Sequence, residues 1–228
     1  MSEVTGLPRI GDRAPDFMAV TTHIPEFNFS AWQEQDWVVM FSHPADFTPV
    51  CTTELLEFAR QHEKFSERRV KLVGLSVDSV HAHLAWLQNM KQKMGVTISF
   101  PLIADIDMKV SQLYGMIHPG ASSTATVRTV FVIDPKRIIR ALIYYPMNVG
   151  RNVEEVLRLV TALQTTEQFT CATPVNWHEG EKVVVPPPKT VQDVEQREGQ
   201  SDLEQKDFYL MLKDLKARKT AEPSESSA

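Results

Sequence analysis

Residues 43–54 read His43-Pro-Ala-Asp-Phe-Thr-Pro-Val-Cys51-Thr-Thr-Glu54. They follow the continuous apolar run 37–41, which predicts a strand that is buried on both faces. They lead into a helical pattern that begins near Pro49, because threonine is a good N-cap and proline is tolerated in the first helical position. Thr48 and Pro49 are therefore predicted to turn the chain from a strand into a helix.

Cys51 falls in the first turn of this predicted helix. Unpaired backbone N–H groups and the positive end of the helix dipole gather there, and both favour a thiolate over a thiol. A buried and unreactive cysteine is the alternative, because cysteine is common in protein cores. The position of the residue alone leaves both interpretations open.

Two neighbours of Cys51 favour a reactive sulfur. The hydroxyl of Thr48, three residues earlier, can lie on the same side as the sulfur, accept a hydrogen bond from a peroxide and donate one to the sulfur. Pro44 can cover the pocket and keep water from it. The pattern Pro44-x-x-x-Thr48-x-x-Cys51 resembles that of the peroxiredoxins, in which the cysteine thiolate attacks a peroxide O–O bond and becomes a sulfenic acid.

The wider segment 41–55 resembles the one-cysteine, peroxiredoxin 6-like branch of that family. The resemblance covers residues 7–188, and residues beyond 188 match poorly. It implies a thioredoxin-like α/β fold with an N-terminal addition and a C-terminal arm that packs on a partner subunit. The other segments that carry the resemblance are 75–79, 83–86, 145–146, 150–152 and 172–177.

The hydrophobic periodicity also indicates an α/β fold. A helix at 52–68 and a strand at 70–77 complete a strand–helix–strand unit, which implies a right-handed crossover. Strands at 129–133 and 138–144 flank a short loop and predict a hairpin. The remaining predicted elements are helices at 81–94, 108–114 and 152–165 and a short strand at 99–104. The residues of helix 81–94 expected to face inward are Leu84, Leu87 and Met90 or Met94.

The chain changes character after residue 166. We predict a thioredoxin-like peroxidase domain over 7–168, a C-terminal arm and dimerisation region over 169–218, and a disordered tail over 219–228. Within the arm, the apolar residues of 202–216 suggest a short docking helix. A homodimer or a higher homo-oligomer follows from the resemblance and not from the composition.

Composition excludes several classes of function. The hydrophobic content of 43% and the charged content of 23% are ordinary for a globular protein. The net charge of −5 argues against nucleic acid or an anionic membrane as a partner. No apolar run has the length of a membrane span, and the N-terminal residues lack a secretory signal pattern. Two cysteines do not make a disulfide scaffold, so the cytoplasm is the expected compartment.

Two arginines are candidates for the cation that a poorly hydrated thiolate needs. A guanidinium stabilises the thiolate and also polarises the peroxide oxygens. Arg128, in the segment 126–131, resembles the catalytic arginine of the family. Arg151, between Gly150 and Asn152, resembles a second arginine of this branch. The alternative for both residues is a solvated surface charge.

Two further candidates lie beside the motif. Glu54, three residues after Cys51, can orient an arginine through a paired hydrogen bond, or it is an ordinary acid of the first helical turn. His43 either forms a hydrogen bond near the sulfur or is a structural histidine.

We expect no metal and no cofactor. His81 and His83 are two residues apart on a predicted helix, and this spacing does not point both rings at one ion. The sequence contains no HExxH motif, no paired CxxC and no glycine-rich phosphate loop. Four aromatic residues are predicted to form core or pocket wall and not a cofactor site: Trp37, Phe41, Phe47 and Trp86.

One activity of the branch is not carried over. Some peroxiredoxin 6-like proteins also act as lipases through a serine in a Gly-x-Ser-x-Gly setting. In this chain that serine position is Asp36, and the upstream histidine position is Ser30. These two residues cannot supply an activated serine nucleophile.

The sequence therefore predicts a thiol-specific peroxidase of antioxidant defence, in which Cys51 reduces hydrogen peroxide or an organic hydroperoxide. The reductant is an external thiol: thioredoxin, glutaredoxin with glutathione, or a small thiol. The alternative is a non-enzymatic peroxide sensor or holdase chaperone. The set of Thr48, Cys51 and Arg128 favours turnover, because a sensor needs reactivity but not fast recycling.

Cys171 is a candidate for the thiol that resolves the sulfenic acid. Two-cysteine peroxiredoxins place that thiol just before a Pro-x-x-Trp, and here Thr173 occupies the position before Pro174. A shift by two residues moves a sulfur by up to about 7 Å, which is roughly the largest Cα separation that a disulfide tolerates. A one-cysteine mechanism is therefore predicted. The alternative is an arm mobile enough for Cys171 to condense with the sulfenic acid of Cys51.

Overall fold

A computed structural model of the protein describes residues 7–197, 200 and 202–215. The chain divides into two compact units, residues 1–157 and 158–228. The division falls inside helix α6 (Val153–Phe169). The boundary between residues 168 and 169 that the sequence suggests stays a prediction, and the tail 219–228 lies outside the described residues.

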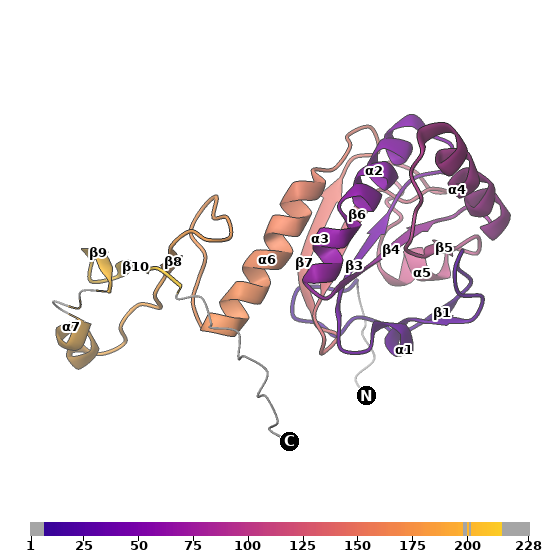
Figure 1. Cartoon of the computed structure of the whole chain (residues 1–228). Coiled ribbons are helices and arrows are strands. Elements are labelled where there is room, and N and C mark those ends of the chain that lie inside the picture. The colour runs from indigo at the N-terminus through magenta and orange to yellow at the C-terminus, as the bar shows by residue number, and fades with distance from the viewer. Residues whose placement is uncertain (1–6, 198–199, 201, 216–228) are drawn as a thin grey trace, which may run out of the picture. The chain divides into compact units, whose positions relative to one another are not determined.

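The first unit is built on a five-stranded sheet in the order β5-β4-β3-β6-β7 (Figure 1). The central strand β3 (Trp37–Ser42) is parallel to β4 (Val70–Ser76), which is parallel to β5 (Leu102–Ala104). On its other side, β3 is antiparallel to β6 (Arg128–Ile133), and β6 is antiparallel to β7 (Ile139–Tyr145). Parallel strands followed by an antiparallel hairpin are the α/β arrangement that the sequence predicts.

The two faces of the sheet carry separate apolar contacts, because successive side chains of a strand point to opposite faces. On one face, Val38 and Met40 belong to a buried cluster that includes Tyr114. On the other face, Phe41 stacks on Phe58 with ring centroids 4.1 Å apart. All six residues of β3 are buried, which explains the continuous apolar run in the sequence.

The helix predicted at 52–68 is in fact two helices, α2 (Pro49–Arg60) and α3 (His62–Glu67), which follow one another along the sheet in Figure 1. Gln61 separates them, with φ −94° and ψ 1°, in the region between α and β. Buried apolar residues continue across the break, so the hydrophobic spacing alone does not reveal it.

Helix α4 (Val80–Met94) starts after the N-cap Ser79, whose side chain accepts a hydrogen bond from the N–H of Ala82. The prediction of its inward residues is partly wrong. Met90 is buried, but Leu84 and Met94 are 46% and 45% exposed. The other two buried side chains of the helix are His83 and Trp86. A histidine with buried hydrogen-bond partners thus occupies a core position, which hydropathy does not anticipate.

Shorter elements complete the first unit. The N-terminal addition contains β1 (Met18–Ala19), which is antiparallel to β2 (Phe27–Asn28), and α1 (Phe29–Gln33). Helix α5 (Lys109–Leu113) follows β5. None of the helices among the described residues is long and apolar enough to cross a membrane.

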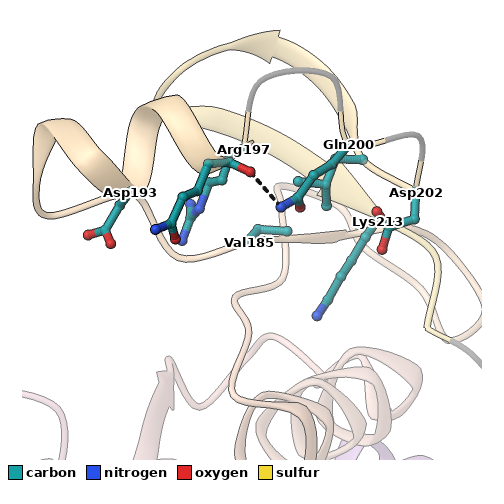
Figure 2. A pocket seen from close by; sticks show the side chains of 8 residues that line it. Val185, Asp193, Arg197, Gln200, Asp202 and Lys213 are labelled. Carbon is teal, nitrogen blue, oxygen red and sulfur yellow. Dashed lines mark hydrogen bonds between the residues drawn. The ribbon is translucent and has the colours of Figure 1, made fainter.

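The second unit contains a small sheet in the order β8-β10-β9 and the helix α7 (Val191–Arg197). The strands are β8 (Val183–Val184), β9 (Glu204–Asp207) and β10 (Leu210–Lys213). The predicted docking helix at 202–216 is therefore wrong over its described part, where β9 and β10 form an antiparallel pair. A hollow of about 340 Å³ lies beside α7. Figure 2 shows charged side chains of both signs around it: Asp193, Arg197, Asp202 and Lys213.

Candidate active site

Cys51 is the third residue of α2, and its side chain is 0% exposed. Thr48 is the N-cap residue, with an extended backbone, and Pro49 opens the helix as predicted. Among the described residues, the hydroxyl of Thr48 caps no helix N–H, because it donates instead to the carbonyl oxygen of Ala45 at 2.8 Å. The hydroxyl therefore braces the loop 43–48, and its oxygen can still accept a hydrogen bond from a substrate.

Arg128 opens β6 and brings its guanidinium to the sulfur. One Nη lies 3.4 Å from Sγ of Cys51 and 2.7 Å from Oε2 of Glu54. The Nε and the other Nη donate to the carbonyl oxygen of Met147 at 2.9 and 2.7 Å. Arg128 is 2% exposed, so it is not a surface charge. Hydrogen bonds from three of its nitrogens fix the guanidinium beside the sulfur.

Arg151 and Glu54 form a buried bidentate salt bridge next to Cys51. The Nε and one Nη of Arg151 donate to the two carboxylate oxygens of Glu54 at 2.8 and 2.6 Å. The other Nη donates to the carbonyl oxygens of Ser42 and Thr129, at the ends of β3 and β6. The guanidinium also lies over the ring of Phe41, 5.2 Å from its centroid. Arg151 therefore ties the carboxylate to the central sheet.

Charge interactions keep Glu54 ionised. Burial alone raises the pKa of Glu54, but the attraction and hydrogen bonds of Arg151, and then the charge of Arg128, outweigh burial and hold the pKa below its ordinary value. Burial lowers the pKa of Arg151, and Glu54 opposes this effect. An arginine stays charged because its ordinary pKa lies far above neutrality. The site therefore holds two fixed cations and one fixed anion around the sulfur.

The free energy of unfolding should depend on pH through Glu54. A carboxyl group whose folded pKa is lowered contributes stability above its ordinary pKa of 4.5, and that contribution disappears as the pH falls through the folded value. We expect Glu54→Gln to lose about 3–5 kcal/mol at neutral pH, because it leaves buried guanidiniums without their anion. Denaturant unfolding of both proteins should show that this difference shrinks below pH 4.5. A difference that stays constant down to the acid limit would contradict the ion contact.

Three buried polar side chains meet beside the cysteine motif, His43, Asp46 and His83, and the sequence suggested a role near the sulfur only for His43. Nε2 of His43 and Nδ1 of His83 lie 2.9 and 2.7 Å from the two carboxylate oxygens of Asp46. One potential ligand atom from each residue lies within 4.8 Å of the others. The sequence suggested a pairing of His81 with His83 and ruled it out. It did not indicate the group of His43, Asp46 and His83, because His83 is distant from the other two in sequence. The signal that could have found it is an acid three residues after a histidine in a loop.

The remaining residues that the sequence singled out are Pro44, Phe47 and Cys171. Pro44 is buried in the loop 43–48. Phe47, which we expected in the core or a pocket wall, is 57% exposed and has φ 55°, so it is not a core residue, and its place in a pocket wall stays a prediction. Cys171 belongs to the second unit, where its thiol donates to the carbonyl oxygen of Thr165 at 3.8 Å. Burial raises the pKa of the Cys171 thiol, against the opposing pull of Lys213.

A cysteine at the start of a helix, with an arginine in contact with its sulfur, is the arrangement of a reactive cysteine, as in the cysteine-based redox enzymes. The sequence model of the AhpC/TSA family matches residues 10–142, and that of the C-terminal domain of 1-Cys peroxiredoxin matches 162–201. The chain belongs to the peroxiredoxin family, in its one-cysteine branch, and is a thiol-dependent peroxidase.

The similarity to known proteins covers nearly the whole chain. A peroxiredoxin of Aquifex aeolicus is 51% identical over 92% of this chain and 99% of that protein. The structure of a yeast mitochondrial 1-Cys peroxiredoxin has a TM-score of 0.82 and 41% identity, and covers 92% of this chain and 100% of its own. A cysteine-to-serine mutant of peroxiredoxin 6 from Arenicola marina has a TM-score of 0.81 and 34% identity, with 90% and 97% covered. This likeness confirms the predicted thioredoxin-like fold.

Proposed function

We propose that Cys51 is the nucleophile that attacks the peroxide. The observation that carries this proposal is the 3.4 Å contact between an Nη of Arg128 and the Cys51 sulfur. The thiolate attacks one peroxide oxygen, so that an S–O bond forms while the O–O bond breaks. The departing oxygen takes a proton and leaves as water or an alcohol, and Cys51 remains as a sulfenic acid. Two equivalents of an external thiol then return the sulfenic acid to a thiol, with release of water and a disulfide.

The neighbouring groups have separate roles in this mechanism. The guanidinium of Arg128 stabilises the thiolate and the negative charge that develops on the departing oxygen. Arg151 and Glu54 hold Arg128 in place. The hydroxyl oxygen of Thr48 accepts a hydrogen bond from the peroxide, and Pro44 excludes water. Because the Cys51 side chain is fully buried, a peroxide reaches the sulfur only when the side chains that cover it move.

The direct test is an anaerobic titration of the reduced protein with one equivalent of peroxide, followed by measurement of the intact mass. We expect a gain of one oxygen atom that maps to Cys51. An unchanged mass would reject the proposal. A loss of two hydrogens would indicate a disulfide with Cys171 and replace the one-cysteine mechanism.

The proposed reductant is an external thiol of the glutathione or thioredoxin type. The yeast structure concerns a 1-Cys peroxiredoxin whose thiol is resolved via glutathione/thioredoxin systems. Two cysteines in a chain of this length do not make a disulfide scaffold, which favours a compartment where thiols persist. We therefore assign the protein to the cytoplasm and to antioxidant defence.

The proposed assembly is a homodimer or a higher homo-oligomer of the same chain. In the described sheet, β7 is an edge strand, and the backbone N–H and carbonyl oxygen of its first residue, Ile139, are hydrogen-bonded to Asp12 and Gly11. The edge that a second copy could pair with is therefore 140–145. A long edge strand presents backbone groups that a second copy can pair with. In this proposal, residues 7–168 form the peroxidase domain and 169–218 form the arm that packs on the partner subunit. Analytical ultracentrifugation of the reduced protein tests the assembly.

Cys171→Ser should retain peroxidase activity when a small thiol is the reductant. The raised pKa of the Cys171 thiol leaves little thiolate at neutral pH, and the thiolate is the attacking form. We expect turnover within about twofold of the wild type, the ordinary scatter of a surface change. Peptide mapping of the oxidised wild type should show no Cys51–Cys171 linkage. A stoichiometric linkage that disappears in the serine variant together with turnover would establish a two-cysteine enzyme.

A further inference from the structure

His43, Asp46 and His83 form a polar group inside the first unit, with exposed fractions of 0%, 8% and 0%. His43 and Asp46 belong to the loop 43–48, which also carries Pro44 and Thr48, and His83 belongs to α4. The carboxylate of Asp46 lies between the two imidazoles, with one oxygen 2.9 Å from Nε2 of His43 and the other 2.7 Å from Nδ1 of His83. Hydrogen bonds between side chains thus join the loop before Cys51 to α4.

The hydrogen bonds define the protonation state of His83. Its Nδ1 faces the Asp46 carboxylate, and its Nε2 lies 3.1 Å from the carbonyl oxygen of Ile103. A carbonyl oxygen and an ionised carboxylate only accept hydrogen bonds, so both nitrogens of His83 must carry protons. His83 and Asp46 therefore form a buried ion pair. This pairing agrees with the pKa of Asp46, which burial raises but the two histidines together lower below its ordinary value.

The same reasoning assigns the tautomer of His43. Its Nε2 donates to the remaining oxygen of Asp46. Its Nδ1 is buried and has no hydrogen-bond partner among the residues that the structure describes. Burial lowers the pKa of His43 in spite of the opposing charges of Asp46 and Asp78, so the ring is neutral and Nδ1 keeps its lone pair. An acceptor nitrogen is thereby held at the start of the loop that carries Pro44 and Thr48.

The loop 43–48 also connects this group to Arg151 of the active site. The backbone N–H of Asp46 donates to Asp78, which follows β4. The carbonyl oxygen of Ser42, the residue before His43, accepts from Arg151. The loop 43–48 is thus held from two directions, by α4 and the β4–α4 turn on one side and by the arginine cluster on the other. A change in this group would reach the substrate-facing loop directly.

Stability alone does not call for such a group. Each buried charge loses its hydration, and a well-packed apolar set of similar volume is often as stable as a buried ion pair. The ion pair instead fixes orientation and protonation, which apolar packing cannot do. In hydrogen-bonded histidines, the partner of one ring nitrogen decides the state of the other.

We propose that Asp46 and His83 are positioning residues of the peroxidase reaction, in which the doubly protonated His83 fixes the Asp46 carboxylate and the carboxylate holds His43 with its proton on Nε2. They act through His43 and through the loop 43–48, and neither is a catalytic residue. The inference rests on the proposed role of Cys51 only for its effect on rate, because the protonation states can be measured without peroxide.

The first measurement uses the reduced wild-type protein. Nitrogen-15 NMR of the imidazoles at neutral pH should show His83 protonated on both nitrogens and His43 protonated on Nε2 alone. A His43 ring protonated on Nδ1, or a singly protonated His83, would overturn the proposal without any variant. A stoichiometric metal ion bound to the purified protein through these rings would also overturn it, because a metal would take the place of the bridging protons.

Two substitutions of Asp46 separate its acceptor role from its charge. In Asp46→Asn, the amide oxygen still accepts from Nε2 of His43, and the amide NH2 can donate to a singly protonated His83. In Asp46→Ala, His43 loses its acceptor and its fixed tautomer. We expect the rate constant with peroxide to stay within threefold of the wild type in the asparagine variant and to fall at least tenfold in the alanine variant. His81→Ala, an exposed histidine of the same helix, is the matched control and should leave the rate unchanged.

The outcomes distinguish this inference from the proposed function. Equal rates in folded Asp46→Ala and wild type would overturn the positioning role while the role of Cys51 stands. Equal losses in the alanine and asparagine variants would show that the charge and not the acceptor matters, which also overturns it. If Asp46→Ala does not fold, the NMR of the wild type and of Asp46→Asn decides, since the asparagine variant must keep His43 protonated on Nε2 and make His83 singly protonated.

Discussion

Cys51→Ser should abolish peroxide turnover and leave the fold intact. The attacking group is a thiolate, and a serine hydroxyl has far too high a pKa to ionise beside a single guanidinium at neutral pH. The replacement exchanges one sulfur atom for oxygen in a fully buried side chain at the start of α2. We therefore expect the helix and the contacts of Arg128 to keep their positions. We expect turnover below a few per cent of the wild-type rate, which is the largest effect that any single substitution should have.

The measurement is steady-state consumption of hydrogen peroxide with a thiol donor in excess. Near-ultraviolet circular dichroism and thermal unfolding show whether the serine variant is folded. Cys171→Ser is the matched control, because it removes the other cysteine of the chain by the same change. A folded Cys51→Ser protein that keeps more than a few per cent of the activity would remove Cys51 from the mechanism. Loss of peroxide consumption in both variants would instead indicate that the two thiols work together.

The local part of the site could be predicted from the sequence. Thr48, Pro49 and Cys51 lie within four residues, and helix capping and dipole arguments apply to such a segment without knowledge of the rest of the fold. Arg128 could be predicted because its segment resembles the one that carries the catalytic arginine of the family, and the structure places it as the first residue of β6. The contact of its guanidinium with the carbonyl oxygen of Met147 could not, since it depends on the path of a loop.

The group around Asp46 shows where sequence reasoning ends. His83 is on a helix that starts well after the motif, and its hydropathy places it on the polar side of the pattern. Only the packing of α4 against the loop 43–48 brings its ring to Asp46. A buried polar group of this kind is invisible to hydrophobic periodicity, which assigns Leu84 to the core in its place. The structure leaves Leu84 exposed.

The predicted docking helix at 202–216 is the other wrong prediction. The apolar residues of 202–216 satisfy a loose helical spacing, but in the structure Leu210 is 36% exposed, Met211 is 1% exposed, and both lie in the strand β10. In a segment this short, the periods of a helix and of a strand give nearly the same pattern of apolar residues. Pairing with β8 and β9, which the sequence does not indicate, decides between them.

The charges of the active site balance only when the sulfur is ionised. Arg128 and Arg151 contribute two positive charges, and Glu54 contributes one negative charge, all three being nearly buried. One positive charge therefore remains, which a thiolate at Cys51 would match. A thiol in the same place would leave a buried cation uncompensated, which is costly in a low dielectric. Because Arg151 is fully engaged with Glu54 and the sheet, Arg128 is the residue that provides the unmatched charge.

Arg128→Ala should therefore slow the reaction of Cys51 with peroxide by about 10²–10³, corresponding to about 2–4 kcal/mol for one charge-assisted contact in a dry site. Arg128→Lys should recover only part of that loss. A lysine restores the charge, but its single ammonium group cannot reach the sulfur, Glu54 and the Met147 carbonyl oxygen in the geometry that the planar guanidinium provides.

Single-turnover stopped-flow kinetics with hydrogen peroxide measure the rate constant directly. Arg140→Ala, which removes a partly exposed arginine of the same sheet, is the control and should react at the wild-type rate. If the alanine variant of Arg128 is folded and reacts as fast as the wild type, the guanidinium has no part in the chemistry, and the lysine variant should then also show no defect.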